Sequence, residues 1–335
     1  MRDESLTYLK ALIATPSPSG FEQPVANLYR DYVSQFADKL TTDVMGNVSA
    51  VINPDAGMRI MYVGHMDEIG FIVHYIDEEG FLYFDTIGGT DVATEIGQRV
   101  WVHGHERVAG VVGRKAIQTF KLADGSQTPT LKDLWIDIGA ASRKDAEAAV
   151  KVGSPVSLQA EFTRLLGDQA VDRAFDKKAG LFIGSEIVRR LKEDGGLHPD
   201  VGLYVLGTVQ EEIGSRGAQT AAFNLAPHQG KLDLGKGPGI SQEPSTNPVV
   251  FELLKTAADR ERIPYQLQAY GDKIPTDARL LQTNCGGVAT GLLSVPLRYM
   301  HTPSEVLCLG DITATIDLVC AFCSSVRPDT DFTPW

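Results

Sequence analysis

The stretch VGLYVLGTVQEE at residues 201–212 decides the fold class of this protein. From Val201 to Val209 it is nearly all apolar, which is typical of a strand in a sheet whose two faces are both covered. The preceding AGLFIGSEIVRRL, at 179–191, has the apolar spacing of a helix. A helix that leads into a buried strand is the repeating unit of an α/β domain, so the sequence predicts that class.

Helices and strands on both sides of this stretch continue the same pattern. Apolar periodicity predicts a helix-helix-strand-strand start and, after residue 170, a second series of alternating elements. Together they favour an α/β/α domain with a mixed sheet. The predicted helices cover 4–14, 22–37, 179–191, 215–223, 247–262 and 311–326, and the predicted strands cover 46–52, 59–65, 201–209 and 288–299.

The segment from Gly70 to about Phe162 has a different texture. Short apolar runs such as FIVHYI and FLYFDTI alternate with turns, and the DEEG sequence between these two runs predicts a hairpin loop. We therefore expect a small β-rich domain at 70–165. It would be inserted into a catalytic domain that is split between 1–69 and 166–335.

The charge balance and the absence of long apolar runs exclude several classes of partner. The chain has 335 residues, with 43 acidic and 31 basic side chains and a formal net charge of -12. Such a surface repels phosphate backbones and anionic membranes, so neither nucleic acid nor a membrane is an expected partner. The N-terminal MRDESLTYLK lacks the apolar stretch of a signal peptide, and no run approaches the ~18 apolar residues of a membrane span. We expect a cytoplasmic protein.

Polar residues follow two of the predicted strands directly. His65 ends the apolar run RIMYVGH and Asp67 follows it. Alternate residues of a strand share a face, so His65 could bind a metal with Asp67 behind its ring. Glu211 and Glu212 follow the strand at 201–209 and point in different directions, so one could bind a metal while the other reaches a water. A histidine beside a turn aspartate, and a solvated acidic turn, are the purely structural alternatives.

Asp176 and His301 lie at two further junctions. Asp176, in AVDRAFDKKAG, precedes a predicted helix, where it could equally be a helix N-cap, and Asp172 is a competing carboxylate. His301, in VPLRYMHTPSE, follows the last predicted strand, and a hydrogen-bonded loop histidine is the alternative there. His103 and His105 could also clamp a metal, but no carboxylate cluster lies near them in the sequence.

Residues at strand ends meet at one edge of an α/β sheet, which is where such sheets place their sites. Two histidines with several carboxylates suit Zn²⁺, Co²⁺ or Mn²⁺, and two such ions bridged by a carboxylate are a common device of hydrolases. The sequence contains neither a Gly-rich phosphate loop with its Lys-Ser/Thr nor a G-x-S-x-G elbow. A metal-dependent hydrolase is therefore the predicted class.

The motifs around these residues resemble a known family. The chain is similar to the TET-type aminopeptidases, family forty-two of the metallopeptidases, whose members are called glutamyl, lysyl or deblocking aminopeptidases and, in some cases, endoglucanases. The resemblance runs nearly end to end. It rests on PSPSGFEQPV (16–25), GHMDEIGF (64–71), DLWIDIGA (133–140), AFDKKAG (174–180), TVQEEIGSRGA (208–218), LGKGPGI (234–240), PTDA (275–278) and PLRYMHTPSE (296–305).

The resemblance implies an aminopeptidase that hydrolyses N-terminal residues from short peptides. It also implies a PDZ-like insertion used for dimerisation, assembly of the dimers into a tetrahedral dodecamer, and two divalent ions per subunit, zinc or cobalt. His65 then binds one ion, Asp176 bridges both, and Glu211 is the general base that takes a proton from a water bridging the ions. Asp67 orients the ring of His65. The implied metal ligands are His65, Asp176, Glu212 and His301.

One ligand that the resemblance implies has no counterpart in the sequence. The family carries an acidic residue on a strand after the helix that follows the Glu pair, whereas here only NLAPHQGK separates Phe223 from LDLGKGPG. Asp233, the nearest acidic residue, lies beyond that position. If the segment is truly deleted, the centre holds one ion or none. The alternative function is then a catalytically impaired member, or a shell-forming or binding protein.

A polysaccharide hydrolase is a further alternative, because some members carry the endoglucanase label. That chemistry needs two carboxylates about 5–10 Å apart across a sugar. Glu211 and Glu212 are sequence neighbours that diverge, and the two histidines would have no role. The sequence therefore favours the aminopeptidase.

Overall fold

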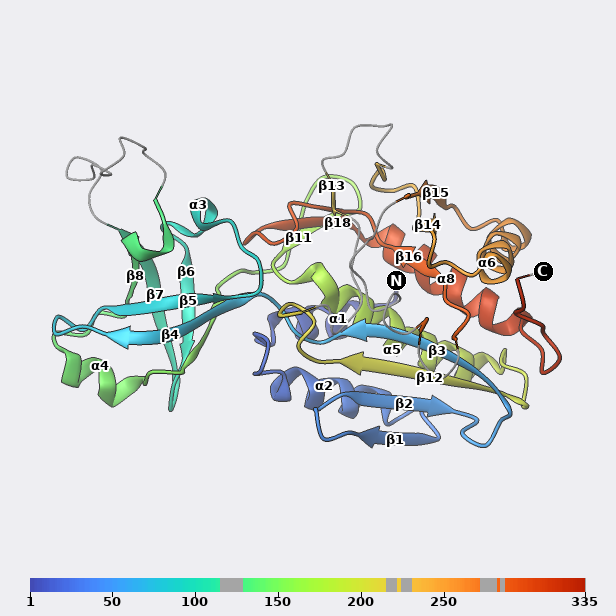
Figure 1. Cartoon of the computed structure of the whole chain (residues 1–335), viewed down its shortest axis with the longest axis horizontal. Coiled ribbons are helices and arrows are strands. Elements are labelled where there is room, and N and C mark those ends of the chain that lie inside the picture. Colours follow the sequence, from blue (N-terminus) through green and yellow to red (C-terminus); the bar gives the residue numbers. More distant parts are fainter. Residues whose placement is uncertain (115–128, 215–221, 224–230, 272–281, 284–286, 335) are drawn as a thin grey trace.

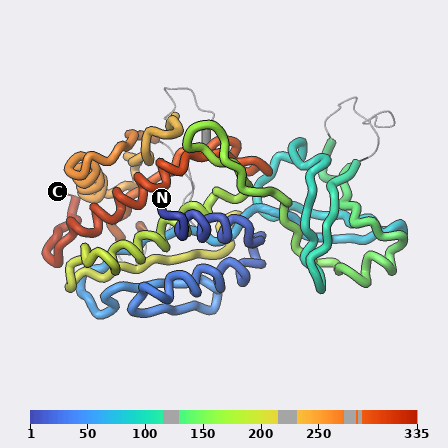
Figure 2. Tube along the Cα trace, turned by 180° about the vertical axis from the view of Figure 1, so that it is seen from behind, coloured from blue at the N-terminus to red at the C-terminus, as the bar shows by residue number. Residues whose placement is uncertain are grey.

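The computed structural model describes residues 1–114, 129–214, 222–223, 231–271, 282–283 and 287–334. Two parts share the chain (Figure 1): a β-barrel, drawn at the left, and a larger part at the right in which helices pack around three sheets. Figure 2, seen from behind, shows both chain ends in the larger part. The protein is thus a mixed α/β protein with a β-rich insertion, the class that the apolar strand predicted.

The sheet that carries the site consists of β1 (Lys39–Thr42), β2 (Val48–Ile52), β12 (Val201–Thr208) and β3 (Met58–His65), in that order. Strands β12 and β3 are parallel, and their register runs from Val201 opposite Met58 to Thr208 opposite His65. The two strands therefore end level with each other. The residues that follow them meet at one edge of the sheet.

Three helices, α1 (Asp3–Ala14), α2 (Gln23–Val33) and α5 (Phe175–Asp194), pack against one another, and α2 and α5 also contact this sheet. Helix α5 packs on β3 and β12, and α2 packs on β2. Phe182, Ile183 and Ile187 of α5 are fully buried, which explains why this apolar helix lies over the sheet. The predicted helix at 22–37 ends four residues early, at Val33.

Two further sheets, built of strands of two to four residues, complete the larger part. The first sheet has the order β10 (Thr163–Arg164), β11 (Gln169–Asp172), β18 (Glu305–Cys308), β17 (Leu297–Arg298) and β13 (Ala222–Phe223). The second sheet has the order β15 (Gln266–Ala269), β14 (Gly239–Gln242) and β16 (Leu292–Ser294). Helices α6 (Pro248–Glu261) and α8 (Leu309–Ser325) pack against each other, and α8 also packs on α5. Across the described part of the chain, no helix combines the length and apolarity needed to cross a membrane.

Two predicted elements differ from the structure. The strand predicted at 288–299 was wrong as a single element, because β16 and β17 belong to different sheets and Val295 and Pro296 separate them. Proline lacks the N–H that a strand ladder needs, which explains the break. The helix predicted at 215–223 was wrong at its end, since Ala222–Phe223 pair with β17 as a strand. Its first part, 215–221, lies outside the described residues.

The barrel closes in the order β4 (Gly70–Ile76), β5 (Leu82–Ile87), β8 (Leu134–Asp137), β7 (Arg107–Arg114), β6 (Arg99–His103) and β9 (Pro155–Leu158). Two short helices, α3 (Val92–Glu95) and α4 (Arg143–Ala149), and a 3-10 turn at Leu131–Asp133 accompany it. Gly80, with φ 91°, allows the tight turn between β4 and β5 that the sequence predicted. The buried side chains of the barrel form a core of their own, around Phe71, Phe84 and Ile136.

The outer edge of β3 pairs with no strand among the described residues. A cavity of about 520 Å³ lies along this edge, lined by residues 58–64 on one side and 287–293 on the other. A sheet that lacks a strand leaves such a gap, because unpaired strand edges and apolar side chains then face no partner. The gap is consistent with the short connection that the sequence has after Phe223.

Gly64 brings β3 and α5 into close contact, and Gly64→Ala is expected to destabilise the protein by about 1–3 kcal/mol. A Cβ at this position would lie 2.9 Å from the carbonyl carbon of Gly180, so strand and helix would have to move apart. Gly180→Ala is the matched control, because its Cβ would meet nothing nearer than 3.8 Å and alanine favours a helix. Urea unfolding measures both variants, and equal midpoints for the two would contradict this expectation.

Candidate metal centre

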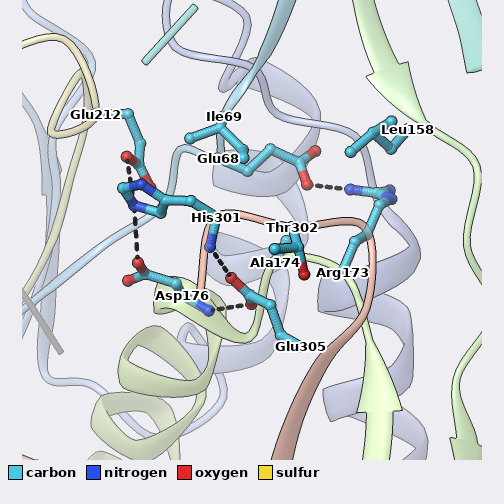
Figure 3. A pocket seen from close by; sticks show the side chains of 10 residues that line it. All are labelled: Glu68, Ile69, Leu158, Arg173, Ala174, Asp176, Glu212, His301, Thr302 and Glu305. Carbon is cyan, nitrogen blue, oxygen red and sulfur yellow. Dashed lines mark hydrogen bonds and ion pairs between the residues drawn. The ribbon is translucent and has the colours of Figure 1, made fainter. Parts of the chain in front are cut away.

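Five of the predicted side chains converge at the carboxyl ends of β3 and β12 and the start of α5. Their ligand-type atoms form two overlapping groups, within each of which the atoms lie within 4.8 Å of one another. Figure 3 shows Asp176, Glu212 and His301 facing one another. The first group is His65, Glu211 and Glu212, and the second is Asp176, Glu212 and His301.

His65 is 1% exposed and has two different ring environments. Its Nδ1 lies 3.0 Å from the backbone oxygen of Asp67 and 3.2 Å from the Oδ1 of the same residue. Its Nε2 is buried, has no hydrogen-bond partner among the residues that the structure describes, and lies 3.7 Å from Asp176 Oδ1 and 3.9 Å from Glu211 Oε2. A proton on Nδ1 therefore suits Asp67 and leaves the Nε2 lone pair directed at the carboxylates.

Asp67 joins three segments of the chain beneath the centre. It is fully buried, and its Oδ2 accepts a hydrogen bond of 2.6 Å from the hydroxyl of Ser19 and one of 2.9 Å from the backbone N–H of Glu212. Asp67 thus contacts the ring of His65, through its backbone oxygen, and the backbone of Glu212, through its carboxylate.

The glutamate pair sits on a sharp turn after β12. Gln210 has φ 61°, and its N–H donates to the buried carboxylate of Glu22. This turn directs the two glutamates differently. The Oε2 of Glu212 lies 3.4 Å from Nε2 of His301, whereas Oε1 of Glu211 is buried without a hydrogen-bond partner.

Asp176 lies at a kink near the start of α5, where it has an extended backbone (φ -80°, ψ 104°) and the regular helix begins only after Lys177. Its Oδ2 lies 3.3 Å from Nε2 of His301, so its two oxygens face two different histidines. The competing carboxylate, Asp172, accepts the backbone N–H of Arg173 and belongs to neither group.

Burial controls the titration of the carboxylates. It raises the pKa of Glu212 to about 8, and the charge of Asp176 adds to this effect. Burial also raises the pKa of Glu211, against the opposing charges of His65 and Lys177. For Asp176 burial acts in the same direction, but the interactions with His301 and His65 outweigh it and hold its pKa well below the usual range.

The two histidines take up protons readily in this setting. The hydrogen bond to Asp176 raises the pKa of His301 to about 9 against the effect of burial. Burial would lower the pKa of His65, yet the neighbouring carboxylates of Asp176 and Asp67 raise it well above its ordinary value.

The donor set fits a divalent transition metal. The buried Nε2 of His65 lacks a hydrogen bond among the described residues, which is costly unless a cation or water uses its lone pair. Ligand atoms around tetrahedral Zn²⁺ lie about 3.3–3.6 Å apart, given bonds of about 2.0–2.2 Å. The contacts of His301 Nε2 with Asp176 and Glu212, 3.3 and 3.4 Å, match this spacing.

Metal affinity is expected to rise with pH between about 6 and 8. His301, with a pKa of about 9, and Glu212, with a pKa of about 8, hold protons below these values, and an ion must displace them. Each displaced proton makes affinity rise tenfold per pH unit, so the Kd for Co²⁺ should fall about 10–100-fold per unit. Calorimetric titrations in buffers of different ionisation enthalpy count the released protons. A Kd independent of pH would contradict these pKa assignments.

Two other candidates from the sequence lie away from the centre. His103 is in the barrel, where its Nε2 lies 2.9 Å from the hydroxyl of Ser157. Asp233 is exposed and pairs with Lys231 at 3.1 Å. Neither belongs to the two ligand groups found among the described residues.

Two glycines of the barrel part, Gly88 and Gly89, lie close to the centre and were not predicted from the sequence. A Cβ on Gly88 would lie 3.2 Å from the Cβ of Glu212, and one on Gly89 would lie 3.6 Å from Nδ1 of His301. The turn after β5 of the barrel therefore forms part of the wall of the centre. Only the IGGT sequence could have pointed to this contact, and glycine pairs are common in ordinary turns.

Comparisons with known proteins agree with this geometry. The sequence profile of the M42 glutamyl aminopeptidase family matches residues 46–318. The lysyl aminopeptidase of Pyrococcus furiosus is 32% identical over 348 aligned positions, which cover 97% of this chain and 98% of that protein.

Solved structures give the same result. A TET aminopeptidase from the marine sediment archaeon Thaumarchaeota archaeon SCGC AB-539-E09 superimposes with a TM-score of 0.90 and 32% identity, covering 97% of this chain and 98% of the other. The TET1 peptidase of Pyrococcus horikoshii superimposes with a TM-score of 0.83 and 25% identity, covering 96% and 100%. The motif resemblance is confirmed: the chain belongs to the M42 glutamyl aminopeptidase family and is an aminopeptidase.

Proposed function

We propose that this aminopeptidase removes N-terminal residues from short peptides at a centre of two divalent ions, with Glu211 as the general base. The observation that carries the proposal is the pair of histidine Nε2 atoms held within 3.3–3.9 Å of three separate carboxylates. The proposed ligands are His65, Asp176, Glu212 and His301, with Asp176 between the two ions.

Each side chain of the centre has a different role in the proposed hydrolysis. Bound Zn²⁺ or Co²⁺ would polarise the scissile carbonyl and lower the pKa of a water. Glu211 points its buried carboxylate toward the centre without serving as a ligand in this scheme. Because burial raises its pKa, it is a stronger base than an exposed glutamate and can take a proton from the attacking water and pass it to the leaving amine. Asp67 holds the His65 ring in the tautomer that leaves Nε2 free.

Aminopeptidase activity should depend on both a free N-terminus and bound metal. Purified protein loaded with Co²⁺ is expected to release the first residue of short peptides and to leave the same peptides intact when their N-termini are acetylated. Prior chelation should abolish release, and added Co²⁺ or Zn²⁺ should restore it. Chromatography of the released amino acids measures this. Activity that survives full chelation would contradict the metal centre.

A one-ion centre with impaired activity is the second candidate. The edge of β3, which pairs with no strand in the described part of the chain, favours it, because the ligand that the family carries on a further strand has no counterpart after Phe223 in the sequence. A shell-forming or binding protein would then be the remaining role. Elemental analysis after metal loading separates the candidates, since two ions per chain support the full centre and one or fewer supports the impaired one.

We also propose that the barrel, within a domain at 70–165 inserted between 1–69 and 166–335, mediates dimerisation. The support is its separate core and the homology to TET1 of Pyrococcus horikoshii, which can assemble into a tetrahedron or a large octahedral shell. A tetrahedral dodecamer of this 36.3 kDa chain is the expected assembly. Light scattering coupled to size-exclusion chromatography measures its mass, and a monomer would refute it.

A further inference from the structure

The carboxylate of Glu305 joins the two loops that carry Asp176 and His301. Its Oε2 accepts the backbone N–H of Asp176 at 2.9 Å, and its Oε1 accepts the backbone N–H of His301 at 3.1 Å (Figure 3). Glu305 is 3% exposed, so water does not compete for these bonds. The side chains of the same two residues face each other at 3.3 Å.

The two loops have backbone conformations that need support. His301 has φ 59°, and Ala174, two residues before Asp176, also has φ 59°. This left-handed region is unfavourable for residues other than glycine, and it persists only where the surrounding structure holds it. Each oxygen of Glu305 holds one of these loops by a main-chain N–H.

Glu305 is itself firmly placed. It begins β18, which pairs with β11 so that Glu305 lies opposite Asp172, and the following Val306 and Leu307 are buried. The strand ladder therefore fixes the backbone from which the carboxylate reaches. Because the carboxylate of Glu305 accepts a hydrogen bond from each loop, the positions of its two oxygens determine how far apart the two backbone segments lie.

We infer that Glu305 is a positioning residue that sets Asp176 and His301 at the separation needed to bind a metal ion. The inference rests on the proposed metal-dependent function and extends it to a side chain that touches neither the ion nor the substrate. A buried carboxylate that only holds two backbone segments together would stabilise the fold without changing metal affinity. The protein contains such a carboxylate away from the metal centre, and it serves as the comparison.

Asp311 is that comparison. It is 1% exposed in the first turn of α8, and its two oxygens accept the backbone N–H groups of Gly235 and Gly237, each at 2.8 Å. It thus bonds two backbone N–H groups as Glu305 does, but the residues that it holds, Gly235 and Gly237, belong to neither ligand group. Asp311→Asn and Glu305→Gln each replace one acceptor oxygen by an NH₂ group, which opposes a backbone N–H instead of bonding it.

Glu305→Gln is expected to weaken Co²⁺ binding about 10–100-fold and to shift the visible absorption bands of bound Co²⁺. Asp311→Asn should keep the wild-type Kd and spectrum, even if both variants lose similar thermal stability as metal-free proteins. Titration with Co²⁺, followed by absorption and by competition with a chelator, measures both quantities. Circular dichroism checks that each variant is folded.

The outcomes separate this inference from the proposed function. Wild-type Co²⁺ affinity and spectrum in folded Glu305→Gln would overturn the positioning role and leave the metal centre intact. A wild-type protein that binds no Co²⁺ would overturn both. If Glu305→Gln does not fold, Glu305→Asp replaces it, because aspartate keeps both acceptor oxygens but draws them back from the loops. Unchanged Co²⁺ affinity in that variant would equally overturn the inference.

Discussion

Glu211→Gln is expected to lower kcat by about 10²–10⁴-fold while the protein keeps its metal. The amide has nearly the shape of the carboxylate but cannot accept a proton at the working pH. Glu211 lies in the first ligand group, its Oε1 has no hydrogen-bond partner, and burial raises its pKa. A carboxylate with these properties is suited to accept a proton from a water molecule, whereas a structural carboxylate is normally hydrogen-bonded within the fold.

The measurement is kcat for a short peptide together with metal content by elemental analysis. Glu212→Gln is the matched control, since Glu212 is the neighbouring carboxylate and faces His301 at 3.4 Å. That variant should lose metal as well as activity. If Glu211→Gln keeps wild-type kcat, or if it loses its metal like Glu212→Gln, the assignment of the base is wrong.

Asp176→Asn is expected to abolish activity through loss of metal. One oxygen of Asp176 lies 3.7 Å from Nε2 of His65 and the other lies 3.3 Å from Nε2 of His301. An amide offers one neutral oxygen and an NH₂ group that repels a cation. Metal affinity should therefore fall by more than the about 10–100-fold typical of losing an outer partner of a ligand.

Asp172→Asn serves as the control for this variant. Asp172 is 5% exposed and only four residues away, but its carboxylate accepts the N–H of Arg173 and joins neither ligand group. Its substitution should leave metal content unchanged in the folded protein. Equal metal loss in both variants would indicate general destabilisation instead of a ligand role for Asp176. Elemental analysis and calorimetric titration with Co²⁺ distinguish the two results.

Some of the centre could be predicted from local sequence because each candidate follows an apolar strand or precedes a helix. His65 and the glutamate pair are examples, since β3 and β12 are parallel and in register to their last residues. Parallel strands must end at the same edge, so residues after them converge whatever the rest of the fold does. The same logic failed where the apolar run at 288–299 crossed Pro296, which breaks the ladder into two strands.

Other parts depend on contacts between residues far apart in the chain. Glu305 bonds the N–H of Asp176, 129 positions away, and Gly89 of the barrel faces His301. A buried carboxylate that accepts a backbone N–H has no sequence pattern, because any residue can supply the donor. Sequence analysis therefore could not separate Glu305 from the many glutamates of a chain with 43 acidic side chains.

The sequence by itself determined the α/β class, the β-rich insertion and the residue types of a metal centre, because apolar periodicity and strand-end chemistry are local properties. Only the tertiary structure decided which atoms face one another. It oriented the Nε2 of His65 toward Asp176, placed Asp176 at a kink near the start of α5, and left the outer edge of β3 unpaired among the described residues. These features depend on how separate segments pack, and packing is fixed by side-chain contacts across the whole fold.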